Sequence, residues 1–125
     1  MGVHIVLDFY GVDPKLISDV NLAKAILDEA IKKSGIKTLK SFFHKFELYG
    51  GFSGIYLLET SHVSIHTWPE IKYAAIDIFV CDKSEKAFKF FEIIKEKFKP
   101  KKIDKKVIKR DYYERSPLYT NADAQ

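Results

Sequence analysis

Residues 55–80 read IYLLETSHVSIHTWPEIKYAAIDIFV, and this stretch decides the fold. It contains three segments typical of β-strands, at 55–58, 63–68 and 73–80, because their apolar residues either alternate with polar ones or form a short unbroken run. Pro69 ends the second segment, since proline cannot donate to a strand ladder. Strands so close in sequence pair as hairpins, so the stretch predicts the middle of an antiparallel sheet.

One amphipathic helix is expected on each side of this stretch. The first follows a turn at 11–14, covers about 19–34 and ends at Gly35, and its apolar stripe consists of Leu22, Ala23, Ile26, Leu27, Ala30 and Ile31. The second begins at a cap provided by Ser84 and ends before Pro100, with a stripe made of Ala87, Phe88, Phe91, Ile94 and Phe98. Each helix therefore has one face to bury against a sheet.

Further strands are expected at 3–10, 38–48 and 103–113, and a frayed tail at 120–125. The order of elements is then β-α-β-β-β-β-α-β, and the chain length fits a single domain over residues 1–125. One sheet with both helices on the same face buries both apolar stripes. The predicted fold class is α+β: a two-layer sandwich of one mainly antiparallel sheet with two helices on one face.

The composition indicates the compartment and the partners. The net charge is +4, and much of the basic excess lies between residues 99 and 115, without a known nucleic-acid-binding motif, so a solvated strand face is favoured over a nucleic-acid partner. The apolar runs are too short to span a bilayer, and the amino terminus does not resemble a signal peptide, so no membrane partner is expected. Cys81 is the one cysteine, which excludes an intrachain disulfide and agrees with a reducing, cytoplasmic location.

The segment 59–70 carries the candidate chemistry, because carboxylates, hydroxyls, two histidines and a tryptophan lie close together in it. On a strand, the even-numbered positions from His62 to Trp68 share one face, and the odd-numbered positions share the other. His62 and His66 would then lie about 13 Å apart, so no metal site is expected. No Gly-x-Ser-x-Gly elbow surrounds a serine, which disfavours a hydrolase triad. A structural histidine on a polar face explains any one of these residues but not the whole cluster.

Residues 61–70, SHVSIHTWPE, resemble the Ser-His-x-Ser/Thr-Ile-His-Thr-Trp-Pro-Glu signature of the small prokaryotic S-adenosylmethionine decarboxylases, which depend on a pyruvoyl group. Residues 73–81, YAAIDIFVC, are similar to the Tyr-Ala-Ala-x-Asp-x-Phe-x-Cys segment that follows it in the family. Residues 43–46, 53–54 and 4–10 also fit the family pattern. The resemblance therefore covers nearly the whole chain.

This resemblance implies a proenzyme that cuts itself. Ser61 matches the processing serine, whose hydroxyl attacks the carbonyl of the preceding residue, here Thr60. The amide becomes an ester, β-elimination cleaves the chain, and loss of ammonia leaves a pyruvoyl group on residue 61. The products are a β chain of residues 1–60 and an α chain of residues 61–125. The pyruvoyl carbonyl then acts as the cofactor by forming a Schiff base with the substrate amine and accepting electrons as CO2 leaves.

The resemblance also implies roles for three other side chains. His66 matches the acid/base of self-processing, and Cys81 matches the residue that protonates the product carbanion during turnover. Phe46 matches the aromatic ring that contacts adenine. Glu70 is a candidate for substrate contact, with a solvated carboxylate at the end of a strand as the alternative.

The implied substrate is S-adenosylmethionine, and the product is the aminopropyl donor of spermidine biosynthesis. The implied assembly is a homodimer of processed αβ protomers with sites shared between them. Two alternatives stay open: the same chemistry on arginine or ornithine, or an unprocessed relative that only binds a ligand.

The chain departs from the family pattern at two places. Thr60 stands where the family usually has glutamate, and Glu59 lies one position earlier, which leaves the rate of processing open. The loop in 46–54 is one residue longer than usual and has no proline. In addition, strict alternation places Ser61 and His66 on opposite faces, so Ser61 is expected in the turn before the strand.

Overall fold

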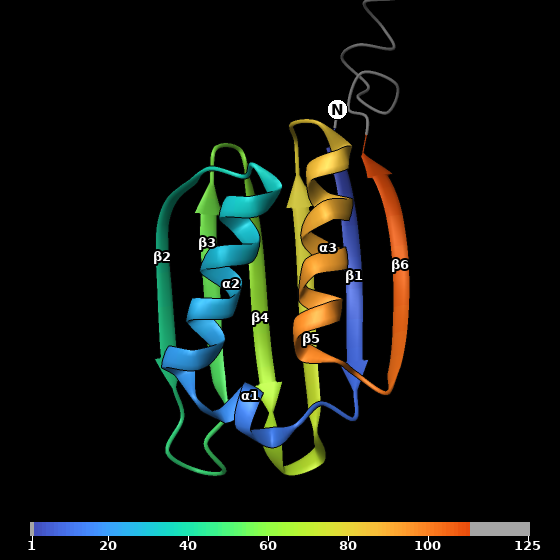
Figure 1. The fold of residues 1–125 in the computed structure, drawn as a ribbon. Helices are drawn as coiled ribbons and strands as arrows, with labels where there is room; N and C mark the ends of the chain where they lie inside the picture. Colours follow the sequence, from blue (N-terminus) through green and yellow to red (C-terminus); the bar gives the residue numbers. More distant parts are fainter. Residues whose placement is uncertain (1, 111–125) are drawn as a thin grey trace, which may run out of the picture.

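Six strands form one sheet in the computed structural model, which describes residues 2–110 (Figure 1). The strands are β1 (Gly2–Tyr10), β2 (Thr38–Lys45), β3 (Phe52–Leu58), β4 (Ser61–Trp68), β5 (Tyr73–Val80) and β6 (Lys102–Arg110). Their order across the sheet is β2-β3-β4-β5-β1-β6, and every neighbouring pair is antiparallel. Residues 55–80 therefore supply most of three adjacent strands, as their sequence predicted.

The helices lie on one face of this sheet (Figure 1). The short helix α1 (Pro14–Ser18) precedes α2 (Val20–Ser34), and α3 (Ser84–Phe98) packs beside α2. Asp19 caps α2 by accepting a backbone hydrogen bond of 3.0 Å within the first turn, and Gly35 ends the helix in a left-handed conformation. The predicted α+β two-layer sandwich is confirmed.

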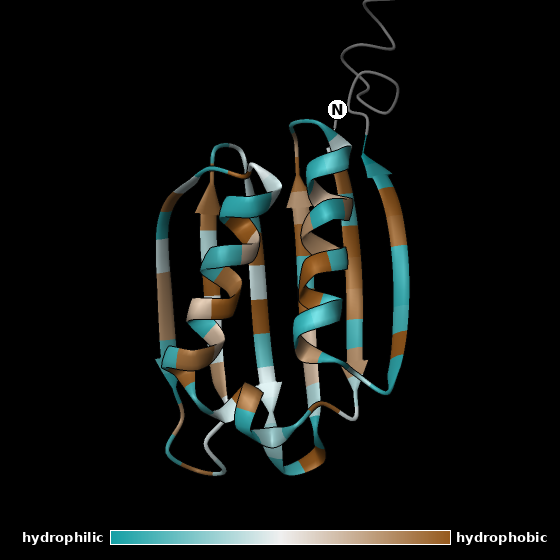
Figure 2. Cartoon of the chain, in the orientation of Figure 1, coloured by the Kyte–Doolittle hydropathy of each residue, from teal (hydrophilic) through white to brown (hydrophobic). Residues whose placement is uncertain are grey.

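The core lies between the sheet and the helices, and strand alternation decides which side chains enter it. In β1 and β5, every second residue is buried while its neighbours face away from the helices. Figure 2 shows the corresponding alternation of hydrophobic and hydrophilic residues along the elements. The helices contribute buried side chains that include Ala23, Leu27, Phe90, Phe91 and Ile94. Removal of this apolar surface from water is the main favourable term in folding.

The opposite face of the sheet is not covered by any helix of residues 2–110. In β4, Val63 and Ile65 are buried against the helices, whereas the even-numbered residues point to this open face, which confirms the predicted division of the strand. Among residues 2–110, no helix has the length and apolar character needed to cross a membrane.

β2 and β3 are the strands whose boundaries differ most from the prediction. β2 ends at Lys45 rather than at residue 48, because the chain turns out of the sheet and the N–H of Phe46 donates to the carbonyl of Gly51, at 2.8 Å. β3 begins at Phe52 rather than at residue 55, so Gly54 lies inside the strand. Glycine is needed at this strand position because the ring of Phe43 occupies the space that a Cβ would fill.

Further differences concern the start of β4, at Ser61 rather than at residue 63, the helix starts and the end of the described chain. Ser84 was predicted to cap the second long helix, but it is the first helical residue, and the N-cap residue is Lys83, whose side chain makes no capping hydrogen bond. α1 and the 3-10 turn η1 (Pro69–Ile71) were not predicted. The last strand is described up to Arg110, so residues 111–113 of the predicted strand and the predicted tail lie outside the described residues.

Candidate active site

Ser61 lies at the end of the sheet, directly after the two-residue turn that joins β3 to β4. Glu59 and Thr60 form this turn, and Ser61 pairs with Leu58 across it. Thr60 has a φ of 61°, in the left-handed region. The expectation that Ser61 lies outside the strand was wrong: it is the first residue of β4, is 8% exposed and faces the helix side of the sheet. The strand begins this early because the turn contains only two residues.

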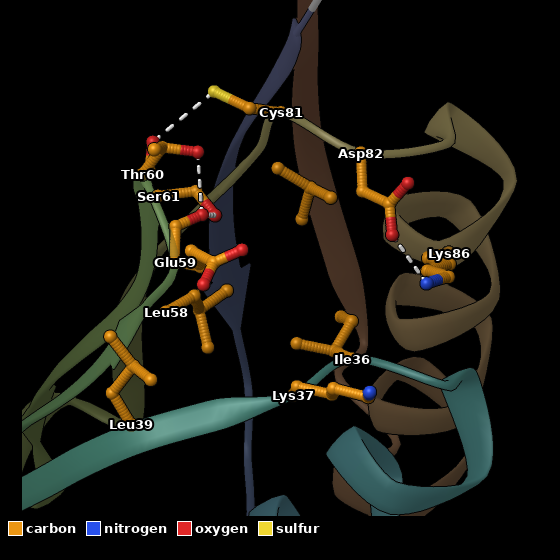
Figure 3. A pocket seen from close by; sticks show the side chains of 11 residues that line it. Ile36, Lys37, Leu39, Leu58, Glu59, Thr60, Ser61, Cys81, Asp82 and Lys86 are labelled. Carbon is orange, nitrogen blue, oxygen red and sulfur yellow. Dashed lines mark hydrogen bonds and ion pairs between the residues drawn. The ribbon is translucent and has the colours of Figure 1, made fainter.

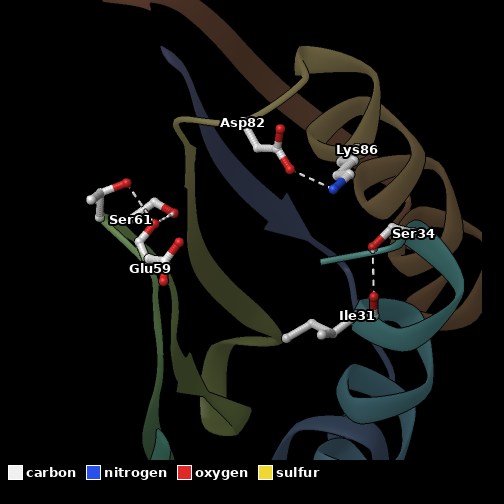
Figure 4. A network of polar contacts seen from close by, with 7 residues as sticks. Ile31, Ser34, Glu59, Ser61, Asp82 and Lys86 are labelled. Carbon is white, nitrogen blue, oxygen red and sulfur yellow. Dashed lines mark hydrogen bonds and ion pairs between the residues drawn. The ribbon is translucent and has the colours of Figure 1, made fainter. Parts of the chain in front are cut away.

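A cavity of about 520 Å³ opens beside Ser61 (Figure 3). Cys81, the residue directly after β5, lines this cavity together with Ser61 and Thr60. On the far wall, Lys86 forms an ion pair of 2.5 Å with Asp82 (Figures 3 and 4). The hydrogen bond from Lys86 holds the pKa of Asp82 below its usual value. The cavity is therefore lined by an ion pair, a hydroxyl and a thiol.

The hydroxyl and the thiol both lie next to the peptide bond between Thr60 and Ser61. The Cys81 thiol donates a hydrogen bond of 3.2 Å to the carbonyl oxygen of Thr60 (Figure 3). Ser61 Oγ donates to the carbonyl of Glu59 at 3.3 Å (Figure 4), and the Thr60 hydroxyl donates to the same oxygen at 2.6 Å. The carbonyl of Thr60 thus has a proton donor at its oxygen and a hydroxyl nucleophile on the next residue.

His66 belongs to a second group of candidate residues, toward the other end of β4 and on the open face. Its Nδ1 is 2.7 Å from Ser53 Oγ, because Ser53 on β3 pairs with His66 in register. A cavity of about 350 Å³ adjoins these side chains and is also lined by Phe46, Trp68 and Glu70. The structure therefore brings together three residues that the sequence singled out, namely Phe46, His66 and Glu70.

The two groups are separate within one chain. Ser61 and His66 are five residues apart on β4, which corresponds to about 17 Å along a strand, and they face opposite sides of the sheet. Cys81 lies with Ser61, whereas Phe46 and Glu70 lie with His66. Within one chain, His66 and Ser61 are therefore not in contact.

A row of stacked rings crosses the open face next to His66. The ring centroids of Trp68 and Tyr73 are 5.2 Å apart, and those of Tyr73 and Tyr10 are 5.3 Å apart. The Tyr73 hydroxyl donates to Asp8 Oδ1 at 2.5 Å, and this hydrogen bond, with some desolvation, raises the pKa of Tyr73 to about 12. The row gives the open face a fixed aromatic surface beside the second cavity.

His62, the other histidine of the segment, also lies on the open face. Its ring centroid is 6.4 Å from that of His4, and His4 Nε2 is 3.6 Å from Asp77 Oδ1. Within residues 2–110, no group of three or more His, Cys, Asp or Glu side chains is arranged to hold a metal ion. These contacts give His62 a packing role on the open face.

Ser53 is the functional candidate that the sequence did not reveal. In the sequence, Ser53 only fits the family pattern, and nothing there predicts a role for its side chain. The register between β3 and β4 could have revealed it, because this register places Ser53 opposite His66. The register depends on the position of the turn at Glu59 and Thr60. A hydroxyl at hydrogen-bonding distance from Nδ1 orients the imidazole and leaves Nε2 for proton transfer.

Comparison with known proteins places this geometry in a family. A sequence model described as S-adenosylmethionine decarboxylase matches residues 3–111. The chain is 45% identical over 123 residues to the S-adenosylmethionine decarboxylase proenzyme of Sulfurihydrogenibium sp., covering 98% of this chain and 92% of that protein. It is 47% identical over 110 residues to the proenzyme of the same name from Persephonella marina, covering 88% and 82%.

A solved structure agrees with these sequence matches. The crystal structure of the adenosylmethionine decarboxylase from Aquifex aeolicus superposes with a TM-score of 0.83 at 37% identity, covering 88% of this chain and 90% of that one. Sequence and fold thus match over most of the length of both partners in each comparison. The chain belongs to the S-adenosylmethionine decarboxylase family.

Proposed function

We propose that this chain is a proenzyme that cuts itself between Thr60 and Ser61 and then decarboxylates S-adenosylmethionine, yielding the aminopropyl donor used to make spermidine. The observation that carries the proposal is the hydrogen bond of 3.2 Å from the Cys81 thiol to the carbonyl oxygen of Thr60, with Ser61 Oγ beside the same peptide. The name proenzyme, which the relatives carry, supports it. The reaction takes place in the cytoplasm, where a lone thiol such as Cys81 stays reduced.

The first step of self-cleavage is an N-to-O acyl shift. Ser61 Oγ attacks the carbonyl carbon of Thr60, and the bond from that carbon to the Ser61 nitrogen breaks as the nitrogen takes up a proton. The carbonyl oxygen gains negative charge in the transition state. The Cys81 thiol already donates to this oxygen, so it stabilises the charge without reorganisation.

The second step breaks the chain. A base removes the Cα proton of Ser61, and the bond between Cβ and Oγ breaks, so that Oγ leaves as part of a new carboxylate on Thr60. Residue 61 is left as a dehydroalanine, and water replaces its nitrogen, which leaves as ammonia. The products are residues 1–60 and a chain of residues 61–125 that begins with a pyruvoyl group.

The pyruvoyl group supplies a carbonyl that binds the substrate amine and accepts the electrons released with CO2. The surroundings of residue 61 fit such a group, because this position is 8% exposed and borders the cavity of about 520 Å³. Cys81 lines the same cavity, so its thiol is placed to return a proton to the substrate carbon after CO2 has left.

A homodimer completes the site in this proposal. His66 with its partner Ser53, and the two candidate substrate contacts Phe46 and Glu70, lie about 17 Å from Ser61 along β4 and on the other face. A second copy, related by a two-fold axis and packed open face to open face with its strands reversed, brings its His66 to the exposed turn that holds Thr60. Each site then uses the serine and thiol of one chain and the histidine of the other.

The open face has the character of such an interface. Large apolar side chains are exposed on it, namely Phe42, Ile55, Leu57, Trp68 and Ile108. Burial of an apolar sheet face of this kind against a second copy removes it from water. Sedimentation at micromolar concentration is expected to show a dimer, and a fully active monomer would contradict the shared site.

The second cavity favours S-adenosylmethionine over a basic amino acid. The ring of Phe46 is 46% exposed beside this cavity and is available to stack on adenine. Glu70 also lines it, so a positive sulfonium would have both a carboxylate and aromatic faces nearby. Glu47, whose carboxylate would suit the guanidinium of arginine, is not among the lining residues.

Measurement of CO2 release from S-adenosylmethionine, arginine and ornithine, each incubated alone with the processed protein, tests the activity. S-adenosylmethionine is expected to be the substrate, and Phe46→Ala is expected to raise its KM about tenfold, a loss of about 1.4 kcal/mol of stacking. Phe88→Ala is the matched control, since Phe88 is an exposed phenylalanine on α3. Release from arginine or ornithine alone would contradict the substrate, and release from none would favour a ligand-binding role.

A further inference from the structure

Thr60 has a backbone conformation that its side chain disfavours. Four non-glycine residues of the described chain have positive φ, namely Tyr49, Thr60, Lys72 and Lys99, and Thr60 is the β-branched one among them. At a φ of 61°, the Cβ and its two branches crowd the neighbouring carbonyl groups. Glycine and asparagine tolerate this region far better. The uncut turn is therefore strained at the residue whose carbonyl is attacked.

Three contacts hold Thr60 in this conformation. The pairing of Leu58 with Ser61 closes the turn around it, and the hydroxyl of Thr60 is hydrogen-bonded to the carbonyl of Glu59 at 2.6 Å. Its own carbonyl accepts from the Cys81 thiol at 3.2 Å. Because β3 and β4 continue on both sides as paired strands, the residue cannot relax while the chain is intact.

We propose that Thr60 is a positioning residue for self-cleavage, and that the strain of its branched side chain drives the cut. This inference rests on the proposed self-cleavage. The acyl shift converts a stable amide into a less stable ester, so strain in the amide form offsets part of an unfavourable step. Once the chain is cut, Thr60 is the last residue of its fragment and its φ is no longer imposed by the turn. The presence of threonine in place of the usual glutamate then favours cleavage.

The hydroxyl of Thr60 offers a different explanation, because it competes with Ser61 Oγ for the carbonyl of Glu59. Three substitutions distinguish the effect of the hydroxyl from the effect of the branched Cβ. Thr60→Val keeps the branched Cβ and removes the hydroxyl. Thr60→Ser keeps the hydroxyl and removes the branch, and Thr60→Asn places a residue that tolerates the left-handed region.

The test is the rate of cleavage of newly made precursor. Each variant is synthesised in a cell-free system, synthesis is stopped, and the intact mass is followed over time. Thr60→Val is expected to cleave at a rate within about twofold of the wild-type rate. Thr60→Asn is expected to cleave about tenfold more slowly, which corresponds to about 1.4 kcal/mol in the barrier, and Thr60→Ser is expected to lie between them.

A second measurement detects the strain without any cleavage. In the Ser61→Ala background the chain stays whole, and adding Thr60→Asn is expected to raise the midpoint of thermal unfolding, whereas adding Thr60→Val is not. If the wild type cleaves and Thr60→Asn cleaves at the same rate, the inference is overturned. It is also overturned if Thr60→Val cleaves as slowly as Thr60→Asn. A wild-type chain that never cleaves would instead overturn the proposed self-cleavage itself, and this inference with it.

Discussion

The thiol of Cys81 and the carbonyl of Thr60 are joined by a hydrogen bond of 3.2 Å, although the two residues lie at the ends of different strands. The register between β4 and β5 brings these ends together, because Ser61 begins β4 and Val80 ends β5. The thiol thereby occupies a position where it can act twice, first on the scissile carbonyl and later on the substrate.

Cys81→Ala is expected to separate these two roles. The variant still cleaves, with a rate lowered by about tenfold because one donor to the carbonyl oxygen is lost. Its decarboxylation falls much further, or yields wrongly protonated product that inactivates the enzyme. Intact-mass time courses and CO2 release measure the two steps, and Cys81→Ser, which restores a donor, should recover most of the cleavage rate. Unchanged cleavage, turnover and enzyme lifetime would remove Cys81 from the site.

His66→Ala is expected to block or greatly slow cleavage, and complementation shows in which chain the histidine acts. When the His66→Ala and Ser61→Ala chains are co-expressed with different tags, the mixed dimer contains one site with both Ser61 and His66. The His66→Ala chain is then cut, although neither variant is cut alone. An uncut His66→Ala chain in a verified mixed dimer would show that His66 does not act across the interface.

Alkaline pH is expected to destabilise the fold through Tyr73. Hydrogen bonding to Asp8 raises the pKa of Tyr73 to about 12 in the folded state, whereas a tyrosine in the unfolded chain has a pKa of about 10. The folded state holds this proton more tightly, so the stabilisation is complete below about pH 10 and is lost as the pH rises through about 12. The urea concentration at the midpoint of unfolding, measured between pH 9 and pH 11.5, should fall less steeply with pH in Tyr73→Phe than in wild type. Equal slopes for the two proteins would argue against the hydrogen bond from Tyr73 to Asp8.

Gly54→Ala is expected to destabilise the β2–β3 hairpin that carries Phe46 and Ser53. An added Cβ would overlap the ring of Phe43, so the variant should lose about 1–3 kcal/mol of unfolding free energy. Phe43→Leu combined with Gly54→Ala makes room and should recover part of the loss. Gly35→Ala is a comparison for backbone strain alone, since its Cβ would meet only the flexible side chain of Lys86, at 3.6 Å. Equal denaturation midpoints for wild type and Gly54→Ala would contradict the packing argument.

The fold followed from the sequence because its signals are local. Alternation in β1 and β5 and the apolar stripes of α2 and α3 depend only on residues near each other in the chain, and the sandwich buries most of these apolar side chains, although Leu22 and Phe88 stay exposed. The predicted start of β3, at residue 55, was three residues late, because glycine disfavours a strand on local grounds and Gly54 lies within this one. It is retained within the strand by Phe43 on the neighbouring strand, a contact that no local pattern encodes.

The sequence predicted the residues of the candidate site, but it did not predict that they fall into two separate groups. Ser61 was expected in the turn, because alternation separates it from His66 and a single site requires them together. The structure keeps Ser61 in the strand and leaves the two residues apart. The role of Ser53 and the left-handed conformation of Thr60 depend on the register of the β3–β4 hairpin, which is set by pairing rather than by composition.

The mass of the purified protein tests the central claim most directly. Wild-type protein and Ser61→Ala are purified in parallel and their intact masses are recorded under denaturing conditions. Self-cleavage predicts two species for the wild type, one with the mass of residues 1–60 and one with the mass of residues 61–125 carrying a pyruvoyl group in place of the amino-terminal serine. It predicts a single full-length chain for Ser61→Ala. A wild-type protein that stays at full length with an unmodified Ser61 after prolonged incubation would contradict the account.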